Sequence, residues 1–141
     1  MDSAVILPPD YKPSPDEEYM NDMQIEYFRQ KLLNWKKSLL GQSKDTLEDL
    51  RQGGLNQPDQ IDRASLESDK ALELRTRDRA RKLISKIDEA LKRIEDGVYG
   101  YCEETGEPIG IERLEVRPVA TLSLEAQERH ERMEKTYDDE A

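Results

Sequence analysis

Residues 25–39 read IEYFRQKLLNWKKSL, and this stretch decides the fold. Its apolar residues recur at spacings of three, four, three and four, at Ile25, Phe28, Leu32, Trp35 and Leu39. This heptad pattern indicates a helix that packs along one seam against another helix. Asn21, with Gln24 three residues later, predicts an N-cap. Gly53-Gly54 predicts the C-terminal end of the helix.

A second helix is predicted to begin between Pro58 and Asp62 and to run to Gly97. Its apolar residues repeat the same spacing, at Ile84, Ile87, Leu91, Ile94 and Val98. In both helices the seam becomes polar toward the Gly-Gly turn. A short connection makes successive helices neighbours, so residues 21–97 are expected to form a long antiparallel coiled-coil hairpin with its tip at 53–64.

The rest of the chain is expected to flank this hairpin. Residues 1–20 are rich in proline and predict an irregular N-terminal arm. Residues 98–122 alternate glycines with apolar residues, which favours turns or short hairpins in a small ribbon-like domain. Residues 123–141 predict a C-terminal helix. The predicted fold is therefore mainly α-helical.

Composition limits the partners and the compartment. Charged residues make up 38% of the chain and the net charge is −10, which argues against direct binding to DNA. This charge favours a basic protein surface, or a metal-bearing or nucleic-acid-binding site of a partner protein. The sequence shows no signal peptide and no apolar run long enough to span a membrane. A single cysteine excludes an intrachain disulfide. We expect a cytoplasmic protein that is a monomer.

Two short corners have the spacing of a four-cysteine zinc ribbon. They are Cys102-Glu-Glu-Thr105 and Ser123-Leu-Glu-Ala126. Only Cys102 can supply a thiolate, since hydroxyl groups stay protonated near neutral pH and alanine offers no donor. We expect no metal cofactor, with the crosslink replaced by apolar contacts among Val98, Tyr101, Ile109, Ile111, Leu114, Val119 and Leu122.

The tip of the hairpin carries two carboxylates. Asp59 and Asp62 stand three residues apart, on one face if the helix has begun. Both residue types favour a helix N-terminus in any case. The alternative interpretation is a probe that presents two carboxylates to Mg²⁺ or to a basic group of a partner.

A basic stripe follows on the second helix. Its members recur at spacings of four, three and four, at Arg75, Arg79, Lys82 and Lys86. They are either a solvated flank or a docking surface for an acidic protein or a phosphorylated ligand.

The sequence shows no set of residues with the pattern of a catalytic site. The single histidine, His130, stands among charged residues and predicts a surface position on a helix. No nucleophile, base and orienting group can be grouped around it, so no enzyme is expected. A metal set of Cys102, Glu103, Glu104 and His130 has no recognisable spacing.

Three stretches carry a resemblance to a known family. They read Asp59-Gln-Ile-Asp62-Arg-Ala64, Leu72-Glu-Leu-Arg75-Thr-Arg77-Asp78-Arg79, and Gly100-Tyr-Cys102 followed by Ile109-Gly-Ile-Glu-Arg113-Leu-Glu-Val-Arg117-Pro118. With them the chain resembles the DksA family of bacterial transcription factors over nearly its whole length. The loss of three of the four zinc cysteines is similar to that in the family's cysteine-poor, zinc-independent paralogues.

The resemblance implies a regulator that binds RNA polymerase rather than DNA. Such proteins insert the coiled coil through the secondary channel toward the active site and change the stability of promoter complexes. They act with the alarmone ppGpp in the stringent response, repressing ribosomal RNA promoters and activating some amino-acid biosynthesis promoters.

The resemblance also implies roles for single residues. Those required for activity at the tip would be Asp59, Asp62 and Ala64. Those that contact polymerase would be Arg79 and Arg113. Those at the ppGpp interface would be Leu83, Lys86 and Arg117. A basic residue of that interface corresponds to Gln127 here. Two alternatives remain, a Gre-type transcript-cleavage factor that recruits Mg²⁺ with an acidic tip, and a structural coiled-coil adaptor.

Overall fold

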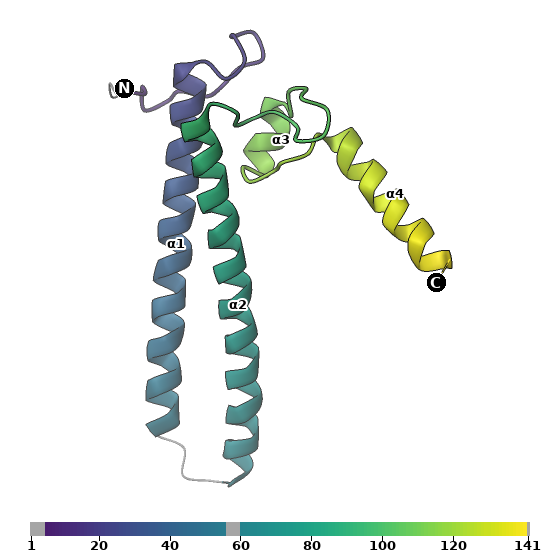
Figure 1. Ribbon diagram of the computed structural model, residues 1–141. Helices are drawn as coiled ribbons and strands as arrows, with labels where there is room; N and C mark the ends of the chain where they lie inside the picture. Colours follow the sequence, from purple (N-terminus) through teal and green to yellow (C-terminus); the bar gives the residue numbers. More distant parts are fainter. Residues whose placement is uncertain (1–4, 56–59, 141) are drawn as a thin grey trace. The chain divides into compact units, whose positions relative to one another are not determined.

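The computed structural model describes residues 5–55 and 60–140, and for 43–55, 60–65 and 137–140 it describes the backbone only. This part of the chain forms helices α1 (Asp22–Leu55), α2 (Gln60–Asp96), α3 (Ile111–Val116) and α4 (Leu124–Glu140) (Figure 1). Within the described residues there is no β-strand, only an isolated bridge between Tyr101 and Pro108. The mainly α-helical class is confirmed. None of these helices is long and apolar enough to cross a membrane.

The two long helices begin and end close to their sequence signals. The Asn21 side chain accepts a hydrogen bond from the Gln24 amide at 2.9 Å, which is the predicted N-cap. The predicted end at Gly53-Gly54 is wrong, because α1 continues through both glycines to Leu55. A helical glycine costs only about 1 kcal/mol relative to alanine, so a pair near a helix end need not stop it.

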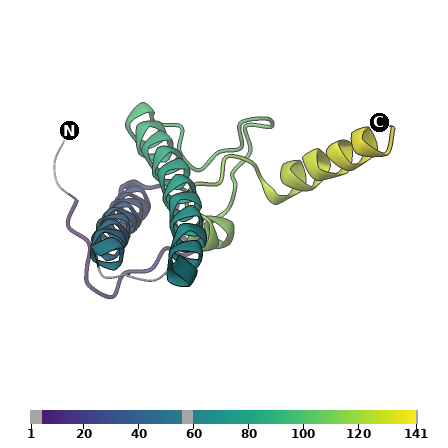
Figure 2. The same cartoon turned by 90° about the horizontal axis from the view of Figure 1, so that it is seen from below.

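The chain divides into two units, Leu33–Asp88 and the remainder, which joins Met1–Leu32 to Glu89–Ala141. The first is an antiparallel hairpin formed by the adjoining parts of α1 and α2, which run side by side in both views (Figures 1 and 2). Lys36 Nζ lies 2.7 Å from Asp88 Oδ1 and links the two helices. Seam residue Ile87 is fully buried and Trp35 is half-buried.

The second unit holds the core of the small domain. Its fully buried side chains include Phe28 and Leu32 of α1, Leu114 of α3 and Ala126 of α4. The ring of Tyr99 lies 5.9 Å from that of Phe28, between centroids. The first turns of α1 therefore share a core with the segment that follows α2.

Two expectations for residues 98–122 are corrected. Turns or hairpins were predicted throughout, but residues 111–116 form the short helix α3. Val98 was placed on the seam and in the core, yet it is 51% exposed, and Tyr101 is exposed as well. The cause for Val98 is Gly97, whose φ of +76° turns the chain after α2 and places Val98 beyond the helical repeat.

Candidate functional site

Two positions of the zinc-ribbon frame, Thr105 and Ser123, bond directly to Cys102, and the fourth, Ala126, bonds to Ser123. Burial raises the pKa of the Cys102 thiol, but hydrogen bonds from the Thr105 hydroxyl and from the amides of Ser123, Thr105 and Glu104 outweigh burial and lower the pKa to about 6. The Ser123 hydroxyl in turn accepts a hydrogen bond from the Ala126 amide at 3.2 Å. Hydrogen bonds therefore connect the four positions of the frame.

The residues at this corner do not fit zinc. A structural zinc ion takes four ligands, and Cys102 supplies the single thiolate. The Thr105 hydroxyl accepts from the Glu107 amide at 3.2 Å, and Ser123 caps the start of α4. Ala126 fills its position with a fully buried methyl group. Hydroxyls that serve as local caps and a methyl group cannot complete a tetrahedral site.

The alternative metal set is not assembled either. His130 Nε2 contacts Glu104 Oε1 at 2.5 Å, and Arg129 lies 3.5 Å from the same carboxylate. These contacts hold the exposed face of α4 against the loop after Cys102. Among the described residues, no group of three or more histidine, cysteine, aspartate or glutamate side chains is placed to bind a metal ion.

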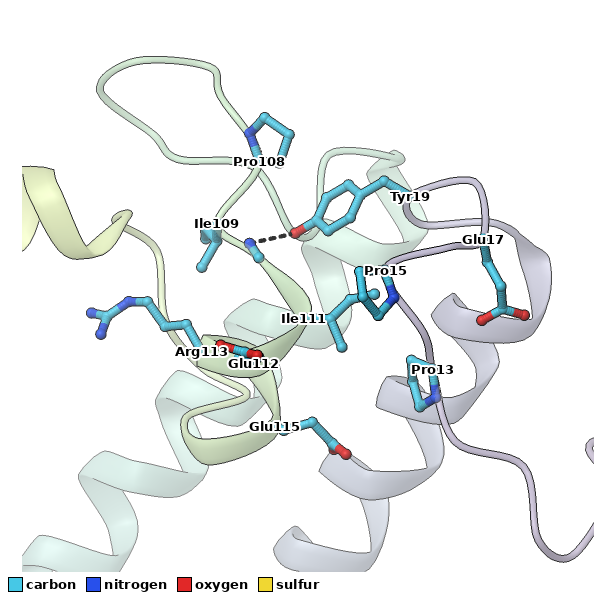
Figure 3. A pocket seen from close by; sticks show the side chains of 11 residues that line it. Pro13, Pro15, Glu17, Tyr19, Pro108, Ile109, Ile111, Glu112, Arg113 and Glu115 are labelled. Atoms are coloured by element: carbon cyan, nitrogen blue, oxygen red, sulfur yellow. Dashed lines mark hydrogen bonds between the residues drawn. The ribbon is translucent and has the colours of Figure 1, made fainter.

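The hydroxyl of Tyr19 joins the two sides of the ribbon. It donates to the Gly100 carbonyl at 2.7 Å. It also accepts from the Gly110 amide at 2.9 Å, the bond drawn in Figure 3. Burial raises the pKa of this phenol, so it stays protonated and able to donate. Sequence reasoning missed Tyr19 because its partners lie more than eighty residues away.

Glycine is required at position 100 by this arrangement. Its φ is +91°, and an added Cβ would stand 2.9 Å from the Cγ and Sδ atoms of Met20. A larger residue would therefore meet both backbone strain and a clash. The Gly100-Tyr-Cys102 motif has this structural basis.

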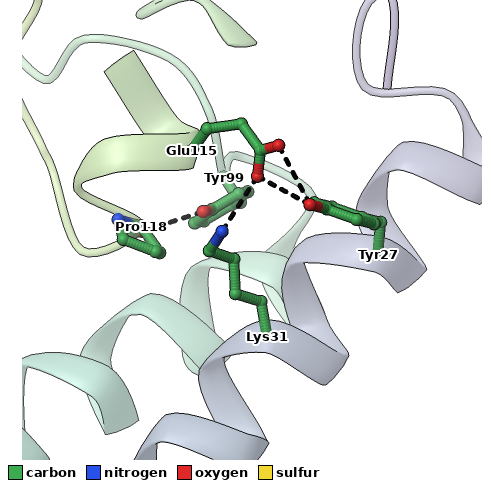
Figure 4. Close-up of polar contacts among 5 residues, drawn as sticks. All are labelled: Tyr27, Lys31, Tyr99, Glu115 and Pro118. Atoms are coloured by element: carbon green, nitrogen blue, oxygen red, sulfur yellow. Dashed lines mark hydrogen bonds and ion pairs between the residues drawn. The ribbon is translucent and has the colours of Figure 1, made fainter. Parts of the chain in front are cut away.

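A polar cluster on the other side of α3 was also missed. The Tyr27 hydroxyl donates to both carboxylate oxygens of Glu115, at 2.8 and 2.9 Å, and Lys31 Nζ lies 3.0 Å from Glu115 Oε1 (Figure 4). Burial, followed by the hydrogen bond and charge of Glu115, raises the pKa of Tyr27 to about 12. Beside it, the Tyr99 hydroxyl donates to the Pro118 carbonyl at 2.8 Å. The cluster fixes α3 against α1.

Two of the residues assigned by resemblance lie on or next to α3. Arg113 is half-buried, and its Nε donates to the Leu122 carbonyl at 3.0 Å. Arg117 is exposed, and its amide bonds to the Arg113 carbonyl at 2.8 Å where α3 ends. Arg113 thus supports the backbone before α4, whereas the Arg117 guanidinium faces solvent.

Three others lie on α2 within the hairpin unit. Arg79 and Lys86 are exposed and Leu83 is half-buried. Arg75 and Lys82 of the same stripe are exposed too. The stripe is therefore a solvent-facing cationic surface on that helix.

The tip residues lie at the limit of what the structure describes. Asp59 falls outside the described residues, and Asp62 and Ala64 are described only as backbone in the first turns of α2. Gln127 is half-buried in α4. The roles assigned to these residues stay predictions.

Comparison with known proteins identifies the family. The model of the DnaK suppressor protein DksA, N-terminal domain, matches residues 24–94, and that of the prokaryotic dksA/traR C4-type zinc finger matches residues 97–132. The chain belongs to the DksA family. The second match covers the ribbon corner, in which Cys102 is the one cysteine among the four ligand positions.

Relatives within the DksA family match along most or all of their length. The RNA polymerase-binding transcription factor DksA of Caulobacter vibrioides (strain NA1000 / CB15N) is 61% identical over 99% of this chain and 100% of its own. The protein of the same name from Escherichia coli (strain K12) is 46% identical over 82% of this chain and 76% of its own. The structure of transcription factor DksA2 from Pseudomonas aeruginosa matches with a TM-score of 0.79 at 44% identity, over 86% of this chain and 93% of that one.

Proposed function

We propose that this protein is a transcription regulator that binds RNA polymerase. The observation that carries the proposal is the 61% identity, over 99% of this chain and the full length of the relative, to a protein named as an RNA polymerase-binding transcription factor. The net charge of −10 supports action on a protein rather than on DNA. We expect it to act as a monomer in the cytoplasm, without enzymatic activity of its own.

The hairpin is the part proposed to enter the polymerase. Helix α1 has 34 residues, which at 1.5 Å each correspond to a length of about 50 Å. A helix pair of this length would reach through the secondary channel toward the active site, bringing Asp59 and Asp62 near it. Ala64 would keep the end slim. The carboxylates would then alter promoter complexes through charge, while the polymerase keeps the catalysis.

The nucleotide ppGpp is proposed as co-regulator at the polymerase interface. Leu83, Lys86 and Arg117 would line that interface, and the exposed cations among them suit a phosphorylated ligand. Gln127 supplies no charge there, so the response to ppGpp should be weaker than with a basic residue. We expect repression of ribosomal RNA promoters and activation of amino-acid biosynthesis promoters, with no zinc required.

The test is transcription in vitro from a ribosomal RNA promoter, with and without ppGpp. Asp59→Asn combined with Asp62→Asn should leave polymerase binding largely intact and abolish repression, because docking and effect reside in different parts of the hairpin. Asp10→Asn combined with Asp16→Asn makes the same charge change at exposed positions of the arm and should leave repression unchanged.

Three outcomes would overturn the proposal. Equal loss of binding in the tip variant would make the tip an attachment point only. Release of short 3′ RNA fragments from backtracked complexes would indicate a Gre-type cleavage factor. Failure of the unmodified protein to bind polymerase would leave a structural adaptor.

A further inference from the structure

A cavity of about 820 Å³ lies within the small-domain unit, between the N-terminal arm and the start of α3 (Figure 3). Its walls are largely apolar and come from both sides, with Pro13, Pro15 and Tyr19 facing Pro108, Ile109 and Ile111. Its size is in the range of sites that enclose a ligand or a few side chains. The Tyr19 hydroxyl is already bonded to Gly110, so this side of the cavity offers the ring rather than a free polar group.

The charge at the cavity is negative. Its lining includes Glu17, Glu112 and Glu115. The Ser14 amide and the Gln24 amide group lower the pKa of Glu17, which also accepts a bond from Tyr11, so this carboxylate stays ionised. The Glu112 side chain is exposed.

Two cations, Lys31 and Arg113, lie beside these three carboxylates and compensate the negative charge only in part. Lys31 binds Glu115, one cation for one carboxylate. The Arg113 side chain also lines the cavity, and its Nε donates to the Leu122 carbonyl. The lining therefore keeps a net negative charge, which can attract a positive group from outside.

We propose that this cavity docks a basic segment of a partner protein, in which an arginine or lysine stands next to a large apolar residue. The apolar side chain packs against the proline and isoleucine walls, and the cation meets Glu112, while Glu17 adds to the negative charge of the cavity. Charge complementarity selects this occupant, since an acidic segment would be repelled and a bare cation would leave the apolar walls uncovered. The inference goes beyond the proposed function and does not depend on it.

The test is a titration of the isolated, full-length protein with short peptides, followed by amide chemical shifts in NMR spectra. The probe is acetylated and amidated Leu-Arg-Leu, and the matched peptides are Leu-Glu-Leu and Ala-Arg-Ala. Leu-Arg-Leu should shift the amides of Gly110 and Ile111, with an affinity that falls as salt is added. Both matched peptides should bind more weakly, because each lacks one half of the interaction.

Two matched variants measure how much the charge of Glu112 contributes to peptide binding. Glu112→Gln should weaken binding of Leu-Arg-Leu by roughly two- to fivefold, as expected for a partly solvated ion pair. Glu125→Gln removes the same charge from an exposed position in the first turn of α4, outside the cavity lining, and should leave the affinity unchanged.

Three results would overturn the inference. They are equal binding of Leu-Glu-Leu, chemical-shift changes confined to other surfaces, or equal effects of Glu112→Gln and Glu125→Gln. The titration contains no polymerase, so its failure leaves the transcription proposal unaffected, and failure of the transcription assay leaves the titration result unaffected.

Discussion

Cys102 is a buried thiol in surroundings that favour its charged form. Backbone amides and the Thr105 hydroxyl bond to the sulfur and lower its pKa to about 6, although burial acts in the opposite direction. In a zinc ribbon such amides support metal-bound thiolates. Here they act on a sulfur with no other thiolate beside it.

The ultraviolet absorbance of the Cys102 thiolate should appear with a midpoint near pH 6, against about 8.5 for an unperturbed cysteine. Because the folded pKa is the lower one, the stabilisation from Cys102 is complete above about pH 8.5 and is lost as the pH falls through 6. The free energy of unfolding should therefore rise between these pH values more steeply than in Cys102→Ser. A thiolate midpoint above pH 8 would contradict the bonding described here.

At the scale of elements, the segment after α2 is tied to the N-terminal arm by the Tyr19 hydroxyl. Residues 98–110 contain no helix, and their turns are held by hydrogen bonds such as Cys102 amide to Glu107 carbonyl at 2.8 Å. The Tyr19 hydroxyl adds the bond to the Gly110 amide just before α3 begins. We expect this bond to take over part of the role that a metal crosslink has in a zinc ribbon.

Tyr19→Phe should lower the free energy of unfolding by about 1–3 kcal/mol, because the Gly110 amide loses its acceptor. The Gly100 carbonyl keeps one hydrogen bond in this variant, since it also accepts from the Ile109 amide at 2.8 Å. Urea denaturation followed by circular dichroism measures the change. Tyr101→Phe is the control, because Tyr101 is exposed and its hydroxyl makes no hydrogen bond to the residues that the structure describes. Equal loss in both variants would show that the hydroxyl bridge contributes nothing specific.

For the molecule as a whole, we expect the zinc-ribbon frame to fold without a metal ion. The corner brings Cys102, Thr105 and Ser123 into hydrogen-bonded contact, and Ser123 reaches Ala126. Four positions so placed should accept four thiolates with little change in the backbone. The same frame should therefore be convertible between metal-free and metal-dependent folding.

The triple variant Thr105→Cys, Ser123→Cys, Ala126→Cys should bind one zinc ion per chain, because it restores a tetrahedral thiolate set. A chelator should lower the unfolding temperature of this variant and leave that of the natural sequence unchanged. Metal content after dialysis and thermal scans with EDTA measure both effects. Adding Cys102→Ser to the variant should weaken zinc retention. Stoichiometric zinc in the natural sequence would contradict the prediction.

The sequence by itself determined what depends on neighbours along the chain. The heptad spacing from Ile25 to Leu39 predicted the first long helix, and Asn21 its cap. The loss of three zinc ligands followed from side-chain chemistry alone. Periodicity and capping act over a few residues, so they can be read without a structure.

Only the tertiary structure decided what depends on residues far apart in the sequence. Tyr19 meets Gly110 across 91 positions, and Tyr27 meets Glu115 across 88. Helix α3, which has only six residues, is fixed by these contacts and by the burial of Leu114. The residues next to a hydroxyl or a carboxylate in the sequence do not predict its hydrogen-bond partner, because only folding brings the two groups together.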